Sequence, residues 1–296
     1  MPRPPLLSRL AQEEPIISDG ATGTYLQMHG LEPGGCPEAF NSDHPGIVRG
    51  MSAAYSEAGS EMVLTNSFGG NRFMLKKYGY GDQLHRFNKL AAQLAREGAG
   101  GDCYVVGSMG PTGEFVEPLG EVTEREMFEA FAEQAAALAE GGADAILAET
   151  MTAVEEATLA VQAAKEATGL PVLVSMTFDK GPRGYFTMMG ISPEQGVLKL
   201  HAAGADVVGT NCGNGIERMV EISDIMRDLT DQPLVVHSNA GIPKLVDMKI
   251  VYDEEPRWMA KRFRRMADMG IKIIGGCCGT TPEHIRELVK AVRPAA

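Results

Sequence analysis

The chain has 296 residues, of which 44% are hydrophobic and 22% are charged, and this ordinary globular composition argues against a disordered chain. Its 27 Lys and Arg against 39 Asp and Glu leave a net charge of −12. Because the chain is acidic and lacks a basic run, we expect no nucleic acid and no membrane surface among its partners.

Eight short apolar or β-branched runs recur along the chain. Their nearly continuous apolar character predicts strands that are buried on both faces of a parallel sheet. The runs are 15–19, 61–66, 103–107, 144–149, 171–176, 206–211, 233–238 and 271–275.

Helix signals lie between these runs. The segments that begin near Thr123 and Thr152 carry a glutamate three residues later, which is the spacing of a capping box. The second of these segments is expected to end at Gly169, shortly before a proline. Ser192 and Thr281 are each followed by a proline at the expected first helical position, which favours two further helix starts.

The alternation of eight strands with helices predicts an α/β fold, a single (β/α)8 TIM barrel domain spanning residues 1–296. A doubly wound open sheet is the alternative, but the glycines of 19–24 lack the GxGxxG spacing of a dinucleotide-binding turn. Long loops belong at the catalytic face of a barrel. The longest irregular segments are expected at 30–44, 110–121, 180–190 and 240–255.

Polar and sulfur-bearing side chains gather where the predicted strands end. Because the carboxyl ends of all barrel strands meet at one mouth, we expect these side chains to converge there. They are Asp19, Asn66, Glu149, Asn211, Cys212, Ser238, Asn239, Cys277 and Cys278.

Three of these residues, Cys212, Cys277 and Cys278, follow the sixth and eighth predicted strands. Three thiolates with one open position are typical of a catalytic zinc site, and soft sulfur favours Zn²⁺ over harder cations. Two other interpretations are buried apolar cysteines and a redox pair, although the adjacent cysteines lack the CxxC spacing. Cys103 begins a core strand and Cys36 lies in a Gly- and Pro-containing loop, so we expect structural or incidental roles for both.

The chain carries no sign of export. No stretch has the apolar length of a membrane span, and the N-terminal segment 1–15 has no secretory signal. Five cysteines are an odd number and do not indicate a disulfide framework in a chain of this length. We therefore expect a cytoplasmic protein with free thiols.

The strand ends and the loops after them contain seven distinctive segments: DGATGT (19–24), LTNSFGGN (64–71), GSMGPTGEFVEPLG (107–120), AET (148–150), GTNCG (209–213), SNAGIP (238–243) and GGCCGTTPEHI (275–285). They resemble the homocysteine S-methyltransferases, which include betaine–homocysteine methyltransferase and the homocysteine-binding module of cobalamin-dependent methionine synthase. The resemblance covers nearly the whole chain and implies a (β/α)8 barrel. It also implies that the three strand-end cysteines are ligands of Zn²⁺.

The resemblance implies roles for the other strand-end residues. Asp19 and Glu149 match carboxylates that hold the ammonium group of homocysteine, although their positions alone fit capping or solvated carboxylates equally well. The backbone around Gly20 and Ala21 matches the part that meets the substrate carboxylate. Asn211 lies beside the first cysteine and is expected to orient it.

The activity that the resemblance implies is methyl transfer to the thiolate of L-homocysteine, which gives methionine. We favour slightly a small onium donor, glycine betaine or a dimethylsulfonium compound, bound in the barrel mouth. The alternative donor is methylcobalamin on a separate corrinoid protein, because Gly69 stands where the animal betaine enzyme has a tyrosine. A non-catalytic subunit that binds zinc or a thiol is a second alternative. Association into a homo-oligomer is compatible with the sequence.

Overall fold

Eight parallel strands form the central sheet of the computed structural model, which describes residues 3–246 and 249–293. Their order is β1-β12-β9-β8-β5-β4-β3-β2, so each barrel strand lies beside the next one along the chain. The two ends of this order also meet, because the backbone N–H of Glu61 donates to the carbonyl of Ile17 at 2.8 Å. The strands are β1 (Ile16–Ile17), β2 (Met62–Leu64), β3 (Tyr104–Met109), β4 (Ala145–Met151), β5 (Val172–Met176), β8 (Val207–Asn211), β9 (Leu234–Ser238) and β12 (Ile273–Gly276).

All eight predicted strands are confirmed, and the fold is a (β/α)8 barrel. The doubly wound open sheet is therefore wrong, since that fold reverses its strand order and leaves two open edges.

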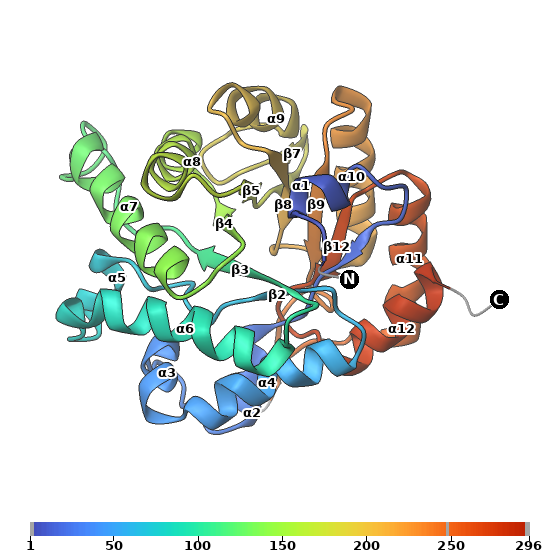
Figure 1. The fold of residues 1–296 in the computed structure, drawn as a ribbon. Coiled ribbons are helices and arrows are strands. Elements are labelled where there is room, and N and C mark those ends of the chain that lie inside the picture. Colours follow the sequence, from blue (N-terminus) through green and yellow to red (C-terminus); the bar gives the residue numbers. More distant parts are fainter. Residues whose placement is uncertain (1–2, 247–248, 294–296) are drawn as a thin grey trace.

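Helices follow the strands and cover the outside of the barrel (Figure 1). The exception is α1 (Leu6–Leu10), whose Leu6 and Leu10 pack with the residues that fill the barrel interior. The other helices are α2 (Thr22–Met28), α3 (Phe40–Asp43), α4 (Pro45–Glu57), α5 (Arg72–Lys77), α6 (Leu84–Ala99), α7 (Glu124–Glu140), α8 (Val154–Thr168), α9 (Pro193–Ala202), α10 (Ile216–Leu229), α11 (Pro256–Asp268) and α12 (Pro282–Val292), with short 3₁₀ turns η1 (Pro37–Ala39) and η2 (Gly81–Gln83). None of the described helices is long and apolar enough to cross a membrane.

The helix starts follow the sequence signals in three of four cases. Thr123 caps α7 through a capping box, and the starts of α9 and α12 at a proline are confirmed. A helix start near Thr152 is confirmed, since α8 begins at Val154, but the predicted capping box is wrong, because β4 continues to Met151 and Ala153 takes the N-cap position with no side-chain cap. The predicted end of this helix is confirmed, since α8 ends at Thr168 and Gly169 follows in the left-handed conformation with φ 64°.

The barrel core forms two apolar layers because successive strand residues point to opposite faces. Ile16, Met62 and Leu147 lie inside the barrel. Ile17 and Val63, one residue along from the first two, pack in the cluster between strands and helices. This arrangement explains why the strand sequences are apolar throughout.

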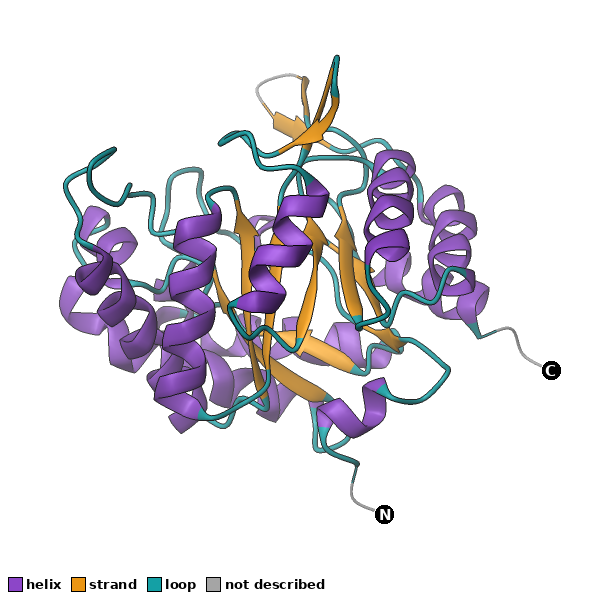
Figure 2. Cartoon of the chain, turned by 90° about the horizontal axis from the view of Figure 1, so that it is seen from above, coloured by secondary structure: helices purple, strands orange, loops and turns teal. Residues whose placement is uncertain are grey.

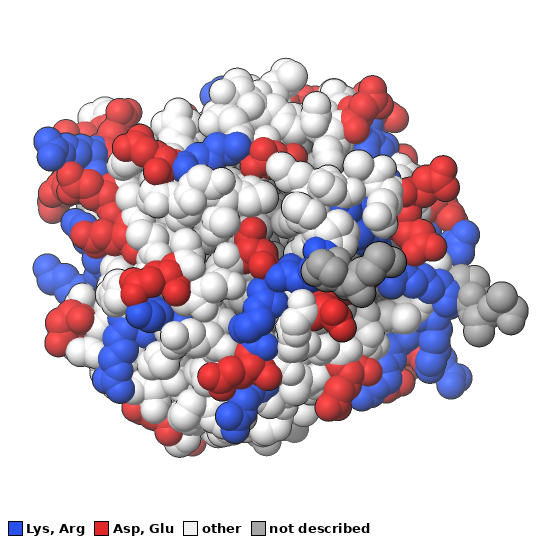
Figure 3. All heavy atoms as spheres, in the orientation of Figure 1, with Lys and Arg blue, Asp and Glu red and all other residues white. Residues whose placement is uncertain are grey.

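Two of the four segments expected to be irregular contain antiparallel hairpins. One is β6 (Asp179–Gly181) with β7 (Gly184–Phe186), and the other is β10 (Lys244–Val246) with β11 (Lys249–Val251). Figure 2 shows β10 and β11 standing beyond one end of the barrel, with the N-terminus at the opposite end. On the face drawn in Figure 3, acidic and basic side chains of the described residues are interspersed.

Candidate metal and substrate site

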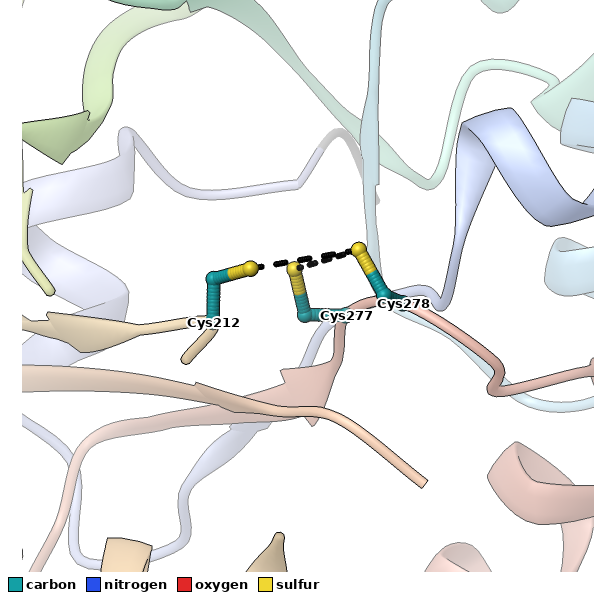
Figure 4. A group of neighbouring side chains, drawn as sticks. All are labelled: Cys212, Cys277 and Cys278. Atoms are coloured by element: carbon teal, nitrogen blue, oxygen red, sulfur yellow. Dashed lines mark hydrogen bonds between the residues drawn. The ribbon is translucent and has the colours of Figure 1, made fainter. Parts of the chain in front are cut away.

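Three cysteine side chains meet at the C-terminal end of the barrel. Cys212 follows β8, whereas Cys277 and Cys278 follow β12, and β9 lies between these two strands. The Sγ atom of Cys278 lies 3.9 Å from that of Cys212 and 4.0 Å from that of Cys277 (Figure 4). All three sulfur atoms lie within 4.8 Å of one another, so they could hold a metal ion.

The sulfur spacing fits a tetrahedral zinc centre. Zinc–sulfur bonds of about 2.3 Å in a tetrahedron place the sulfur atoms about 3.8 Å apart. The observed 3.9 and 4.0 Å separations are close to that value. Three sulfur donors also leave one of four positions open for an exogenous ligand.

The backbone that presents Cys212 is strained. Its φ is 60°, in the left-handed region that side-chain-bearing residues seldom adopt. The backbone N–H of Cys212 donates to the carbonyl of His237, and that of Cys277 donates to the carbonyl of Ser238. Thr150, which lines the same cavity, also has a positive φ, of 63°. Strain of this kind persists only where the surrounding structure holds it, and it clusters at functional sites.

The three cysteine side chains shift one another's pKa values. Hydrogen bonds from Cys277 and Cys278 lower the pKa of Cys212 to about 3. The hydrogen bond to Cys212 is in turn the main reason that the pKa of Cys278 rises to about 12. A cluster that stabilises one thiolate among neighbouring thiols is suited to a cation that displaces their protons.

Glu149 lies two residues before the end of β4 and lines the same cavity as the cysteines. Its carboxylate accepts hydrogen bonds from Ser108 Oγ at 2.5 Å and from Asn211 Nδ2 at 3.3 Å. Burial raises the pKa of Glu149 to about 7. A buried carboxylate to which no Lys or Arg among residues 3–246 and 249–293 is bonded can take up an ammonium group.

Asn211 connects the carboxylate to the cysteines. Its Oδ1 accepts from the backbone N–H of Thr150 at 2.8 Å and from Ser175 Oγ at 2.7 Å. Its Nδ2 donates to Thr150 Oγ1 at 2.8 Å and lies 4.0 Å from Cys277 Sγ. Asn211 is fully buried and does not line the cavity, so it positions the groups around it.

Asp19 is buried behind the cavity wall. Its Oδ2 accepts from the backbone N–H of Leu64 at 2.7 Å, and its Oδ1 accepts from Ser18 Oγ at 3.3 Å. Burial raises the pKa of Asp19 to about 7. Because these bonds tie the end of β1 to β2 and Asp19 does not line the cavity, its role with substrate stays a prediction.

Gly20 and Ala21 do line the cavity, at the start of α2. Thr280 Oγ1 accepts from the backbone N–H of Ala21 at 3.1 Å. A Cβ on Gly20 would lie 2.7 Å from this oxygen, so the close approach requires glycine. Ala21 offers no side-chain cap, which leaves the first N–H groups of α2 free for a ligand.

The cavity has a volume of about 360 Å³, within the range of small-molecule sites. Its walls include residues that the sequence reasoning missed, because they come from loops and a short helix rather than from strand ends. These are Pro37, Glu38, Met74 and Tyr78. The lining residues, all in the described part of the chain, include no Lys, Arg or His.

The other strand-end residues contribute less. Asn66 lines the cavity, but its Nδ2 is engaged by Pro37 and Asn41. Ser238 and Asn239 are buried outside the lining. Cys36 and Cys103 are buried and lie outside the cluster of three thiols.

A segment after the β10–β11 hairpin, residues 252–254, connects the loops that carry the cysteines. Glu254 Oε2 accepts from the backbone N–H of Ile216, which follows the Cys212 loop, at 2.9 Å. The backbone N–H of Glu254 donates to Ala240, whose own N–H donates to the carbonyl of Cys278 at 2.9 Å. The 252–254 segment therefore fixes the distance between the two parts of the thiol cluster.

Comparison with known proteins decides the family. The family model for homocysteine S-methyltransferase matches residues 16–292. The chain belongs to the homocysteine S-methyltransferase family. The resemblance noted in the sequence and the predicted enzyme class, methyl transfer to homocysteine, are confirmed at the level of this family.

Methionine synthases of Mycobacterium leprae (strain TN) and Mycobacterium tuberculosis (strain ATCC 25618 / H37Rv) are each 33% identical over 310 residues. These matches cover 97% of the chain but 25% of each relative, so the chain spans about a quarter of their length. The metallated form of the homocysteine methyltransferase MmuM from Escherichia coli has a TM-score of 0.80 at 22% identity, covering 96% of this chain and 99% of that one. The apo form of the same protein has a TM-score of 0.74. These structural likenesses support the barrel fold.

Proposed function

We propose that this family member transfers a methyl group from a small onium donor to the thiol of L-homocysteine, giving methionine, with Zn²⁺ held by Cys212, Cys277 and Cys278. Glycine betaine and dimethylsulfonium compounds are the donors we favour. One observation carries the proposal: three sulfur atoms at zinc-compatible spacing and the buried carboxylate of Glu149 line one cavity. We propose further that residues 1–296 act as one domain in the cytoplasm, where thiols stay reduced.

Zinc chemistry explains why the thiol cluster matters. A free thiol of pKa about 8.5 is only about 3% ionised at pH 7, and a bound Zn²⁺ supplies the positive charge that keeps the homocysteine sulfur a thiolate. Cys212, Cys277 and Cys278 would hold the Zn²⁺ as three negatively charged ligands.

The chain's own residues would orient the amino acid. Ionised Glu149 attracts the ammonium group, and the free N–H groups at the start of α2, next to Gly20 and Ala21, suit the carboxylate. The resemblance adds Asp19 to the ammonium site, which requires its side chain to turn toward the cavity. Holding both ends of the amino acid fixes the sulfur for in-line attack.

Charge in the cavity favours a cationic donor. The lining residues provide three thiols and two carboxylates, Glu38 and Glu149, and no basic side chain. In the transfer, a sulfur lone pair forms the new S–CH₃ bond, and the electrons of the broken bond return to the donor's nitrogen or sulfur. The donor then leaves as a neutral amine or sulfide.

Methylcobalamin on a separate corrinoid protein is the second candidate donor. The 33% identity to two methionine synthases favours it. Both candidates require the same thiol activation, and they differ in what enters the barrel mouth.

Methionine formation by zinc-loaded protein tests the proposal, with L-homocysteine and, in parallel, glycine betaine, a dimethylsulfonium donor or methylcobalamin. Cys278→Ala removes a proposed ligand, and Cys103→Ala is the matched control because this cysteine is buried away from the cluster. Turnover with an onium donor that only Cys278→Ala abolishes would support the proposal. Turnover with methylcobalamin alone would establish the second candidate. If protein that holds one zinc forms no methionine with any of the donors, the result would indicate a non-catalytic binding subunit.

A further inference from the structure

A second buried carboxylate, Glu38, lines the cavity. Glu38 belongs to η1, in the long loop after β1, and only 2% of its surface is exposed. It lines the same cavity as Glu149 and the cysteines, but it comes from the loop after β1 and contacts Gly69 in the loop after β2.

The contacts of Glu38 leave its charge uncompensated. Oε1 accepts from the backbone N–H of Gly69 at 2.6 Å, and Oε2 accepts from Cys36 Sγ at 3.4 Å. No Lys or Arg within residues 3–246 and 249–293 pairs with it. A buried carboxylate without a cation is costly, so its retention beside a cavity indicates a positively charged ligand.

The neighbours of Glu38 complete a surface for a methylated cation. Phe68 and Tyr78 line the cavity and are partly exposed, with Met74 between them in sequence. The Phe68 ring packs against the backbone of Gly110, because a Cβ atom added to this glycine would lie 2.6 Å from the ring. Aromatic faces attract quaternary ammonium and sulfonium groups.

The backbone of Gly69 approaches the Glu38 carboxylate closely. A Cβ on Gly69 would lie 3.1 Å from Glu38 Oε1, which is tighter than an ordinary contact. Any side chain here would therefore crowd the carboxylate. The φ of Gly69 is not in the left-handed region, so close approach to Glu38, and not backbone conformation, distinguishes this glycine.

We propose that Glu38 is the specificity-determining carboxylate of the donor subsite, where it faces the positive centre of the onium donor while Phe68 and Tyr78 contact its methyl groups. This inference rests on the proposed function. Glu38 takes no part in bond making or breaking. Because the donor loses its positive charge as the methyl group leaves, Glu38 stabilises the bound donor more than the transition state or the neutral product. Its effect therefore falls on donor affinity, and it does not accelerate the chemical step.

Glu38→Gln tests the inference, since it removes the charge and keeps an oxygen for the Gly69 N–H. Glu32→Gln is the matched control, because this exposed glutamate lies in the same loop outside the cavity. For zinc-loaded Glu38→Gln, we expect the KM of the onium donor to rise about tenfold, which corresponds to about 1.4 kcal/mol. The kcat should stay near the wild-type value or rise, the KM of homocysteine should stay near the wild-type value, and the Tm should not fall.

A binding measurement separates this inference from the proposed function. Tetramethylammonium, a cation that does not donate its methyl group under these conditions, is titrated calorimetrically into zinc-loaded protein with homocysteine. Weaker binding in Glu38→Gln supports the cation subsite even if no onium donor turns over. Turnover with an unchanged donor KM overturns the role of Glu38 and leaves the proposed function intact. Equal losses in homocysteine affinity and Tm would instead identify Glu38 as a loop support.

A second variant covers the case in which Glu38→Gln does not fold. Gly69→Ala places a methyl group against Glu38 and leaves the carboxylate in the chain. We expect a similar rise in the donor KM and a small change in homocysteine KM. An unchanged donor KM in this variant would contradict the inference.

Discussion

The side-chain amide of Asn211 donates to Glu149 Oε2 across 3.3 Å, although 62 positions separate the two residues in the chain. Asn211 directly precedes Cys212, so one buried amide links the carboxylate of β4 to the first sulfur of the thiol cluster. Substrate ammonium and substrate sulfur would thus bind to groups that share a single support. The following predictions test this arrangement.

Removing the shared support should disturb both halves of the site. Asn211→Ala leaves the backbone N–H of Thr150 without this partner and removes the hydrogen bond to Glu149 Oε2, and we expect the free energy of unfolding to fall by about 3 kcal/mol. The KM of homocysteine should rise as well. Ser175→Ala is the control, because it removes only one bond to the same amide and should cost about 1 kcal/mol. Chemical denaturation and steady-state kinetics measure both effects, and equal losses in the two variants would refute the shared-support interpretation.

Loss of one sulfur should abolish tight metal binding. We expect Cys212→Ala to hold less than one zinc per chain and to lose at least about 100-fold in activity, since even residues that only support metal ligands cost 10–100-fold. Cys103→Ala should keep both properties, because Cys103 lies outside the cluster. Metal analysis after dialysis against a weak chelator is the measurement. Full zinc content in Cys212→Ala would show that the other two sulfur atoms suffice.

The buried carboxylate should make stability depend on pH in a defined direction. Burial raises the pKa of Glu149 from 4.5 to about 7 in the folded state. Between these two values the folded protein keeps a proton that the unfolded chain has released, so the free energy of unfolding falls as the pH rises through this window.

Glu149→Gln removes this titration. In metal-free protein, we expect the variant to gain stability relative to wild type from pH 5 to pH 8, by up to about 3 kcal/mol. The same variant should bind homocysteine more weakly in the zinc-loaded state, since its side chain cannot pair with ammonium. Denaturant titrations at both pH values measure the difference. A stability difference that is the same at pH 5 and pH 8 would show that Glu149 titrates normally.

The 252–254 segment should support metal affinity without providing a ligand. Glu254→Ala removes the acceptor for the Ile216 N–H, and we expect zinc affinity to fall about 10–100-fold. Glu255→Ala, an exposed neighbour, is the control. Competition with a coloured chelator gives the affinity, and at saturating zinc the activity of Glu254→Ala should largely return. Unchanged zinc affinity would mean that the cysteine loops hold their geometry without this segment.

Much of the fold could be predicted because its signals are local. Continuous apolar runs marked all eight barrel strands, and proline or capping residues marked three helix starts. The spacing of Thr152 to Glu155 imitates a capping box that does not form, because the strand before it runs two residues beyond the predicted run. The two hairpins were missed, since short antiparallel pairs in a loop carry no long periodic pattern.

The sequence by itself determined the barrel, the strand-end position of the three cysteines and the family resemblance, because each depends on residue order along single segments. Only the tertiary structure decided which strand-end groups reach the cavity. It placed Glu149 on the cavity wall and Asp19 behind it, turned Asn211 into a buried support, and added Glu38 and Tyr78 from outside the strands. The physical reason is that side-chain direction depends on hydrogen bonds and backbone angles set by distant segments, such as the positive φ at Cys212, which no local pattern encodes.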